Sequence, residues 1–177
     1  MIAPKRSVAP AELHFPAIFD EHAPFVLRVM RNLGVAPSEL QDQCQEVFVA
    51  VFRGLPEFAG RSSLQTWIYG ICLRVASNHR RRAHVRRERP VADLPEQASP
   101  AGQHEAAEQR QSLPLLRGLL DALDPDKREV FVLYELEELS MKQVAEVCGC
   151  PLQTAYSRLH AARRVLLEKY RELEGTP

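Results

Sequence analysis

The sequence lacks any long apolar run. No stretch approaches the roughly 18 apolar residues that a membrane-spanning helix requires, and the opening residues Pro4, Lys5, Arg6 and Pro10 precede no apolar segment of a secretory signal. We therefore expect a protein of the cytoplasm without membrane insertion. The 177 residues suffice for one ordinary domain or for two small ones.

Cysteine is scarce, and its spacing does not favour a metal site. The four cysteines, Cys44, Cys72, Cys148 and Cys150, form no C-x-x-C pair and have no histidines at zinc-site spacing. We interpret them as small buried hydrophobic residues and expect neither a metal nor another cofactor. A redox or metal role for Cys148 and Cys150 remains the alternative.

Net charge is also missing, because 23 Lys and Arg residues balance 23 Asp and Glu residues. This balance conceals a segregation along the chain. Seven arginines and a single acid lie between Arg74 and Arg89, whereas the next segment is mostly acidic. Charges are screened over about 8 to 10 Å, so a local basic stretch attracts nucleic acid even on a neutral protein. A solvated basic helix end is the alternative interpretation.

Helical periodicity dominates, and no convincing strand pattern appears, so the sequence predicts an all-α fold. Apolar residues recur at steps of three and four between Phe15 and Leu33. Pro24 suits a kink or the first turn of a second helix, and Gly34 ends the segment.

A further helix is predicted from Ser38, whose hydroxyl can cap it while Gln41 reaches back, to about Leu55. Its buried stripe is predicted to contain Leu40, Cys44, Val47, Phe48, Val51, Phe52 and Leu55. At 100° per residue, the side chains left facing outward are Asp42, Gln45, Glu46, Val49 and Arg53.

The next helix is predicted to start at a cap formed by Ser62 or Ser63 and to continue into the arginine cluster. From Pro90 to Ser112 the sequence holds almost no large apolar residues, which is typical of a linker. We therefore predict two small helical domains, residues 12–89 and 113–173, joined by a flexible linker over residues 90–112.

The C-terminal domain has the form of a helix-turn-helix between Leu139 and Leu159. Ser140 and Gln143 make a capping box, small Ala145 permits close helix packing, and Gly149 supplies the turn. Asp124 and Pro125 start an earlier helix. The second helix of the motif turns a donor-rich face outward, as reading the major groove of DNA requires. This face and its flanks contain Gln153, Thr154, Tyr156, Ser157, Arg158, His160, Arg163 and Arg164.

Three aromatic residues, Phe58, Trp67 and Tyr69, lie in and just after a polar loop upstream of the arginines. Aromatic rings beside a positive surface suit single-stranded DNA, because bases stack on them for about 1 to 3 kcal/mol each. The alternative is that Phe58 and Trp67 are core residues.

Two segments, Asp42-Gln43-Cys44-Gln45-Glu46-Val47-Phe48 and Phe58 through Tyr69, followed by a linker and a helix-turn-helix, resemble a bacterial extracytoplasmic-function (ECF) sigma factor. The resemblance covers about residues 15–89 and 113–172. It implies a factor that binds core RNA polymerase and directs initiation at specific promoters.

The resemblance also implies roles for individual residues. The polymerase β′ clamp helices would bind Asp42, Gln45 and Glu46, with Val49 on the same face. The minus-10 element would be opened and held by Phe58, Ala59, Gly60, Arg61, Ser62, Ser63, Trp67, Tyr69, Arg74, Asn78, Arg81 and Arg82. The minus-35 element would be read by Gln153, Thr154, Tyr156, Ser157, Arg158, Arg163 and Arg164. Further implied partners are the polymerase β flap and an anti-sigma factor that holds the two domains together.

Two other classes of protein compete with this interpretation. A helix-turn-helix regulator would bind duplex DNA without polymerase, and would not need the outward face of Asp42, Gln45 and Glu46. A hydrolase or metalloprotein would use Cys148, Cys150 and a histidine. The sequence from His104 to Glu108 lacks the second histidine of a zinc protease, so we expect no enzymatic activity.

Overall fold

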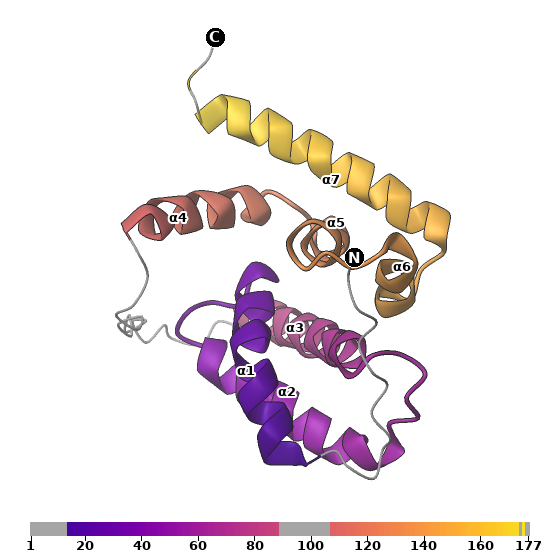
Figure 1. Cartoon of the computed structure of the whole chain (residues 1–177). Coiled ribbons are helices and arrows are strands. Elements are labelled where there is room, and N and C mark those ends of the chain that lie inside the picture. Colours follow the sequence, from indigo (N-terminus) through magenta and orange to yellow (C-terminus); the bar gives the residue numbers. More distant parts are fainter. Residues whose placement is uncertain (1–13, 89–106, 174, 176–177) are drawn as a thin grey trace.

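The computed structural model describes residues 14–88, 107–173 and 175. Within these residues the chain is helical and contains no strand, as the periodicity predicts. Figure 1 shows the first three helices in the lower half of the molecule and the later helices stacked above them. No helix in this part of the chain combines the length and the apolar character that a membrane crossing requires.

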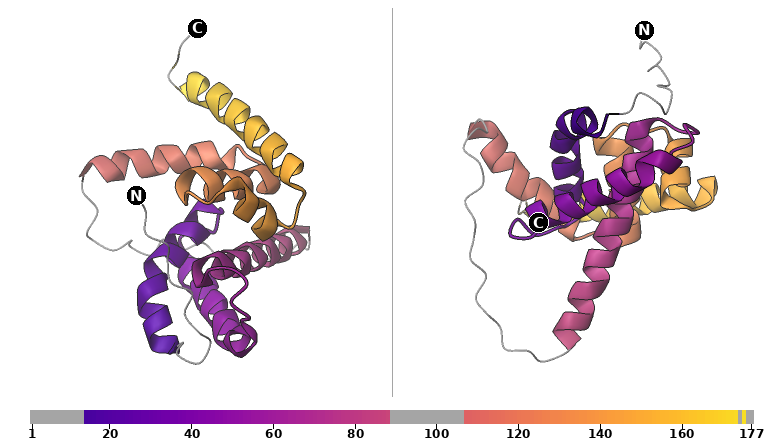
Figure 2. Two further views of the ribbon diagram at one scale, coloured as in Figure 1. Left: turned by 45° about the vertical axis from the view of Figure 1, so that its right-hand side comes forward. Right: turned by 90° about the horizontal axis from the view of Figure 1, so that it is seen from below.

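The N-terminal half consists of α1 (Phe15–Asn32), α2 (Leu40–Gly54), the short 3₁₀ turn η2 (Leu55–Glu57) and α3 (Leu64–Glu88). Helix α1 runs without interruption through Pro24 and ends before Gly34, which adopts a φ of +93°. Ser63 caps α3, because the Thr66 amide donates to its hydroxyl over 3.0 Å. Figure 2 shows the C-terminal part of α3 projecting beyond the other helices.

The predicted cap of α2 is wrong. The helix starts at Leu40 with Glu39 as its N-cap, and no side chain caps it. Phe52 is a second correction, because it was predicted to be buried and is 61% exposed. Helix α1 starts at Phe15, whose ring meets Phe52 edge-on at 5.2 Å. The last turn of α2 therefore lies where the cover provided by α1 ends.

The C-terminal half consists of α4 (Ala107–Asp121), α5 (Pro125–Phe131), the π-helical turn η3 (Val132–Leu136), α6 (Met141–Cys148) and α7 (Leu152–Leu173). Helix α4 begins inside the segment predicted to be a linker. Residues 107–111 lack large apolar side chains but include good helix formers such as Ala, Glu, Gln and Arg. The other linker residues up to 106, and Arg89, lie outside the described residues.

The local signals of the helix-turn-helix are confirmed. Asp124 caps α5 by accepting from the Lys127 amide at 3.0 Å. Ser140 and Gln143 form the capping box of α6, and Gly149 ends this helix with a φ of +62°. Helix α7 packs on α5 and α6, and its inward side chains Ala155, Leu159 and Ala162 are buried.

The two halves share one hydrophobic core. The main cluster joins side chains of α1, α2 and α3 to Val130, Leu133, Leu139, Met141 and Val144 of the C-terminal half. A smaller cluster contains Leu120, Leu123, Val132 and Ala162. Helix α3 packs against α6, and the views of Figure 2 agree on this arrangement.

Gly34 lies at a tight contact between the halves. A Cβ atom placed there would come within 2.1 Å of Nη1 of Arg128, a buried arginine of α5. Because Gly34 also has a backbone conformation that other residues rarely adopt, Gly34→Ala is expected to lower the free energy of unfolding by about 1 to 3 kcal/mol. Urea denaturation followed by circular dichroism measures this change.

Gly118→Ala is the matched control for that substitution. Gly118 is an exposed residue of α4, and a Cβ atom there would meet nothing within 4 Å. Alanine favours a helix interior by about 0.5 to 1 kcal/mol over glycine, so this variant is expected to be slightly more stable than the wild type. Equal effects of the two substitutions would contradict the assigned role of Gly34.

Candidate nucleic-acid interface

The outward face of α2 is a continuous exposed surface. Asp42, Gln45, Glu46 and Val49 are all exposed, while Cys44, Val47, Phe48 and Val51 on the opposite face are buried. The exposed Phe52 adds an apolar ring to the same surface. The face therefore combines two carboxylates and an amide with apolar area, which is the composition of a protein-binding patch with an apolar centre and a polar rim.

The loop between η2 and α3 is anchored by two aromatic rings. Phe58 packs on Trp67 at a centroid distance of 5.1 Å, and Trp67 lies over Gly54, where a Cβ atom would approach the ring to 2.9 Å. Both rings are half-buried. The residues at the tip between the anchors are Ala59, Gly60, Arg61, Ser62 and Ser63. Ala59 and Arg61 are exposed, and Gly60 adopts a φ of +66°.

Tyr69 does not lie on the surface where the sequence predicts it. The side chain is only 1% exposed and packs on Phe25 at 5.0 Å. Its hydroxyl donates to Oε2 of Glu137 at 2.8 Å, and burial together with this carboxylate raises the pKa of the phenol. Tyr69 therefore belongs to the contact between the halves and is not available to DNA in this arrangement. Pattern reasoning missed it because its partner is 68 residues away.

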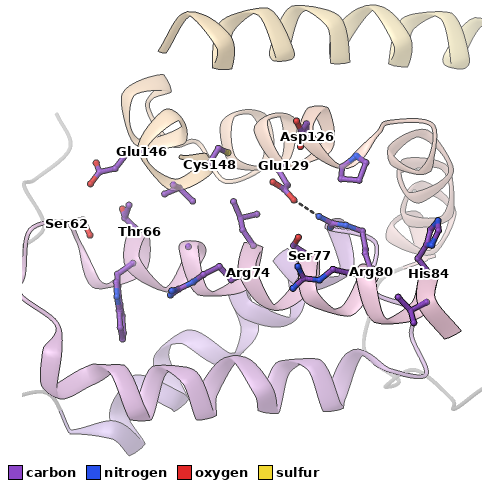
Figure 3. A pocket seen from close by; sticks show the side chains of 17 residues that line it. Ser62, Thr66, Arg74, Ser77, Arg80, His84, Asp126, Glu129, Glu146 and Cys148 are labelled. Carbon is purple, nitrogen blue, oxygen red and sulfur yellow. Dashed lines mark hydrogen bonds and ion pairs between the residues drawn. The ribbon is translucent and has the colours of Figure 1, made fainter. Parts of the chain in front are cut away.

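The remaining basic side chains of α3 form an exposed row. Arg74, Asn78, Arg81 and Arg82 are exposed, and Arg81 donates to Oδ1 of Asn78 at 2.6 Å. Arg74 and Arg81 line a groove of about 950 Å³, whose opposite wall comes from α5 and α6 (Figure 3). Their guanidinium groups are suited to phosphate oxygens, to which arginine can donate two hydrogen bonds at once.

The outer face of α7 is the second candidate surface for DNA. Gln153, Tyr156, Ser157 and Arg164 are exposed and line a hollow of about 520 Å³ together with His160. This hollow is lined by side chains that donate and accept hydrogen bonds, as contact with base edges requires. The Ser157 hydroxyl donates to the Thr154 carbonyl at 2.9 Å, so its oxygen remains able to accept.

Two predicted contacts of α7 have partners within the protein. Arg158 is half-buried and pairs with Asp126, the second residue of α5. Arg163 donates to Glu135 at 2.7 Å and lies 5.9 Å from the centre of the Tyr134 ring. Thr154 is half-buried. These three side chains fix α7 against α5 and η3, so the free recognition surface is narrower than the sequence predicts.

Comparison with known proteins agrees with both surfaces. Residues 18–86 match the family model of Sigma-70 region 2, and residues 114–166 match that of Sigma-70, region 4. The ECF RNA polymerase sigma factor SigC of Mycobacterium tuberculosis is 33% identical over 126 residues, which cover 71% of this chain and 67% of the relative. The ECF RNA polymerase sigma-E factor of Haemophilus influenzae is 31% identical over 149 residues and 78% of each chain. This chain belongs to the ECF family of sigma factors.

Solved structures share the fold of this ECF sigma factor. RpoE of Bartonella quintana, determined in complex with the anti-sigma factor NepR, aligns with a TM-score of 0.69 at 21% identity and covers 87% of this chain and 94% of its own. CnrH in complex with the cytosolic domain of CnrY aligns with a TM-score of 0.66 at 22% identity and covers 89% and 88%. The region 2 match excludes a plain helix-turn-helix regulator, so the sigma factor interpretation is confirmed over its rival.

The cysteines of this sigma factor do not form a metal site. Within the described ranges no three His, Cys, Asp or Glu side chains gather in a way that could hold a metal ion, and all four cysteines are free thiols. Burial raises the pKa of Cys44 to about 11 and that of Cys148 to about 12, so both thiols are protonated at neutral pH. His104 and Glu105 lie outside the described residues. Sigma factors as a family recognise DNA and do not catalyse reactions.

Sequence reasoning missed the polar contacts that join the two halves of this sigma factor. The side chain of Glu137 is 2% exposed and receives two hydrogen bonds from Arg28, at 2.9 and 2.6 Å. Glu129 accepts from Arg80 at 2.6 Å. One signal was present: Glu137 lies between the apolar residues Leu136 and Leu139, where a charged residue needs a partner. The sequence does not say which cation supplies it.

Proposed function

We propose that this sigma factor binds core RNA polymerase through Asp42, Gln45, Glu46 and Val49 on α2. The observation that carries the proposal is the complete exposure of this face on a helix whose other side is fully used by the core. A helix of this kind would gain nothing for folding from two exposed carboxylates and an apolar Val49. Binding to the β′ clamp helices, as in the family resemblance, gives each of them a role.

The same factor is proposed to open the minus-10 element with the loop and with α3. The tip residues Ala59, Gly60, Arg61, Ser62 and Ser63 would hold an extruded base, supported by Phe58 and Trp67 beneath them. A left-handed Gly60 favours this function, since glycine allows close approach of the backbone to a ligand. Arg74, Asn78, Arg81 and Arg82 would then hold the phosphates of the opened strand.

Helix α7 is proposed to read the minus-35 element with Gln153, Tyr156, Ser157 and Arg164. Thr154, Arg158 and Arg163 would contribute contacts to phosphates once their partners release them. Further partners are the polymerase β flap and an anti-sigma factor, a class of protein that accompanies RpoE in its solved complex. The protein would act in the cytoplasm with the polymerase and would have no catalytic chemistry of its own.

Site-specific photocrosslinking tests these assignments. A photoreactive residue introduced at Arg61 is expected to crosslink to the non-template strand of the minus-10 element in the open complex. The same residue at Ser157 is expected to crosslink to duplex DNA at the minus-35 element. Crosslinks of both positions to one element, or of neither to DNA, would overturn the assignment.

Removing Arg81 and Arg82 by alanine substitution is expected to weaken DNA binding to the same extent for every sequence. Each lost phosphate contact on a single strand releases fewer counterions, so the slope of log affinity against log salt falls by about 0.7 per contact. Titrations of holoenzyme with promoter DNA over a range of salt concentrations measure this slope. The control is Lys169→Ala with Arg171→Ala at the end of α7, and an unchanged slope in the Arg81 and Arg82 variant would contradict the assignment.

A further inference from the structure

The groove between the two halves has walls of opposite charge. Its α3 wall carries Arg74 and Arg81, which are proposed above to hold the minus-10 strand. The wall that faces them comes from α5 and α6 and carries Asp126, Glu129 and Glu146 (Figure 3). Carboxylates opposite guanidinium groups occupy the position in which a DNA strand would present its phosphates.

Two carboxylates fasten the C-terminal half onto this wall. Glu129 pairs with Arg80 at 2.6 Å, and the side chains are only 16% and 29% exposed. The buried Glu137 accepts from Arg28 of α1 and Tyr69 of α3. We call Glu129 and Glu137 the latch residues. Charge-assisted hydrogen bonds at low exposure hold more strongly than ion pairs at the surface.

The backbone next to Glu137 is unusual. The π-helical turn η3 (Val132–Leu136) precedes it, and Glu138 follows with a φ of +56°. A non-glycine residue in the left-handed region is uncommon, and π turns are frequent at functional sites. These two features bring the Glu137 carboxylate to Arg28 and Tyr69, so the local geometry serves the contact between the halves.

The other two functional surfaces stay open in this arrangement. Asp42, Gln45 and Glu46 on α2 are exposed, and so are Gln153, Ser157 and Arg164 on α7. Only the groove wall of α3 is faced by the opposite half. The arrangement therefore separates the three proposed contacts: the polymerase and duplex DNA can reach the closed molecule, whereas a melted strand cannot occupy its site.

We propose that the acidic wall of α5 and α6 acts as an internal competitor of the melted promoter strand. The free factor closes on itself through the latch residues without any partner, and polymerase binding separates the halves. This inference rests on the proposed role of α3 in holding the minus-10 strand. It explains how a factor with an exposed recognition helix avoids capturing single-stranded nucleic acid before it joins the polymerase.

Binding of short DNA probes to the full chain tests the proposal. The probes are a fluorescein-labelled single strand of mixed sequence and the duplex of that sequence. The variant Glu129→Gln with Glu137→Gln is expected to bind the single strand about tenfold or more tightly than the wild type, because a larger fraction of molecules is open. Its affinity for the duplex is expected to change by less than about twofold on the same argument.

A matched variant separates opening from simple loss of negative charge. Glu168→Gln with Glu172→Gln removes two exposed carboxylates near the end of α7, and its affinity for the single strand is expected to stay near that of the wild type. With core polymerase present, the latch variant and the wild type are expected to bind a pre-melted promoter equally well. Equal binding of the single strand by the free latch variant and the free wild type would overturn the proposal.

Small-angle X-ray scattering of the free wild-type protein gives a test that does not depend on any substitution. The closed arrangement predicts a compact particle, and a more extended one for the latch variant. An extended wild type would overturn the proposal even if the double variant failed to fold. If transcription proceeded normally and the latch had no effect on strand binding, only this inference would fail; if strand binding by holoenzyme were independent of α3, the proposed function would fail with it.

Discussion

Replacing Asp42 and Gln45 together by alanine is expected to weaken binding to core polymerase by about a thousandfold. Both side chains lie at the middle of the exposed α2 face. Central residues of an interface cost about 2 kcal/mol or more each when truncated, and about 4 kcal/mol corresponds to a factor of about 10³ in affinity. Titration of labelled factor with core polymerase measures the change.

The fold should not be affected by this double substitution. Exposed residues away from caps and buried contacts alter stability by only about 0.5 kcal/mol, so the thermal unfolding curve is expected to match the wild type. Asp20→Ala with Glu21→Ala on α1 is the control, since both are exposed acids outside the proposed face. Wild-type affinity in the Asp42 and Gln45 variant would exclude α2 as the polymerase contact.

The second large effect is expected on the recognition helix. Gln153→Ala with Arg164→Ala removes two side chains that line the hollow on α7. Good base contacts are worth about 1 to 3 kcal/mol each in discrimination, so initiation at the cognate promoter should fall by about 30-fold or more. Abortive initiation assays at low factor concentration, where promoter binding limits the rate, measure this loss.

A promoter variant shows whether the loss arises from base reading. On a template with a scrambled minus-35 element, the wild type and the double variant should initiate at similar low rates. Lys169→Ala, which removes one cation further along α7, controls for the loss of positive charge. If the double variant kept full preference for the cognate minus-35 element, the assignment of α7 as the reading helix would be wrong.

Features set by neighbouring residues could be predicted from the sequence. The Asp124 cap, the capping box of Ser140 and Gln143 and the left-handed Gly149 each depend on residues within one helical turn. The outward face of α2 follows from the helical period alone. For these features, the local pattern and the folded structure agree because no distant part of the chain competes with the local preference.

Features that depend on distant parts of the chain could not be predicted. Tyr69 has the composition of a stacking residue, but Glu137 and Phe25 claim its hydroxyl and its ring. Phe52 fits the apolar stripe of α2, yet the cover provided by α1 ends there. Periodicity reports which residues could be buried, and the packing partner decides which of them are.

The shared core changes how the two conserved functions of the chain relate to one another. The sequence predicts two units joined by a linker, each with its own face for DNA. In the structure the main hydrophobic cluster runs through both halves, and Glu137 and Arg128 bury charged groups at the contact. Separating the halves therefore has a free-energy cost, which binding to polymerase and promoter has to offset.

Run-off transcription with purified core polymerase tests the central claim most directly. The purified chain, mixed with core polymerase and a library of promoter fragments, is expected to yield transcripts that start at defined positions. Their templates should share two sequence elements at fixed spacing, one for the α3 region and one for α7. Absence of specific transcripts from every template, with a factor shown to be folded, would contradict the account.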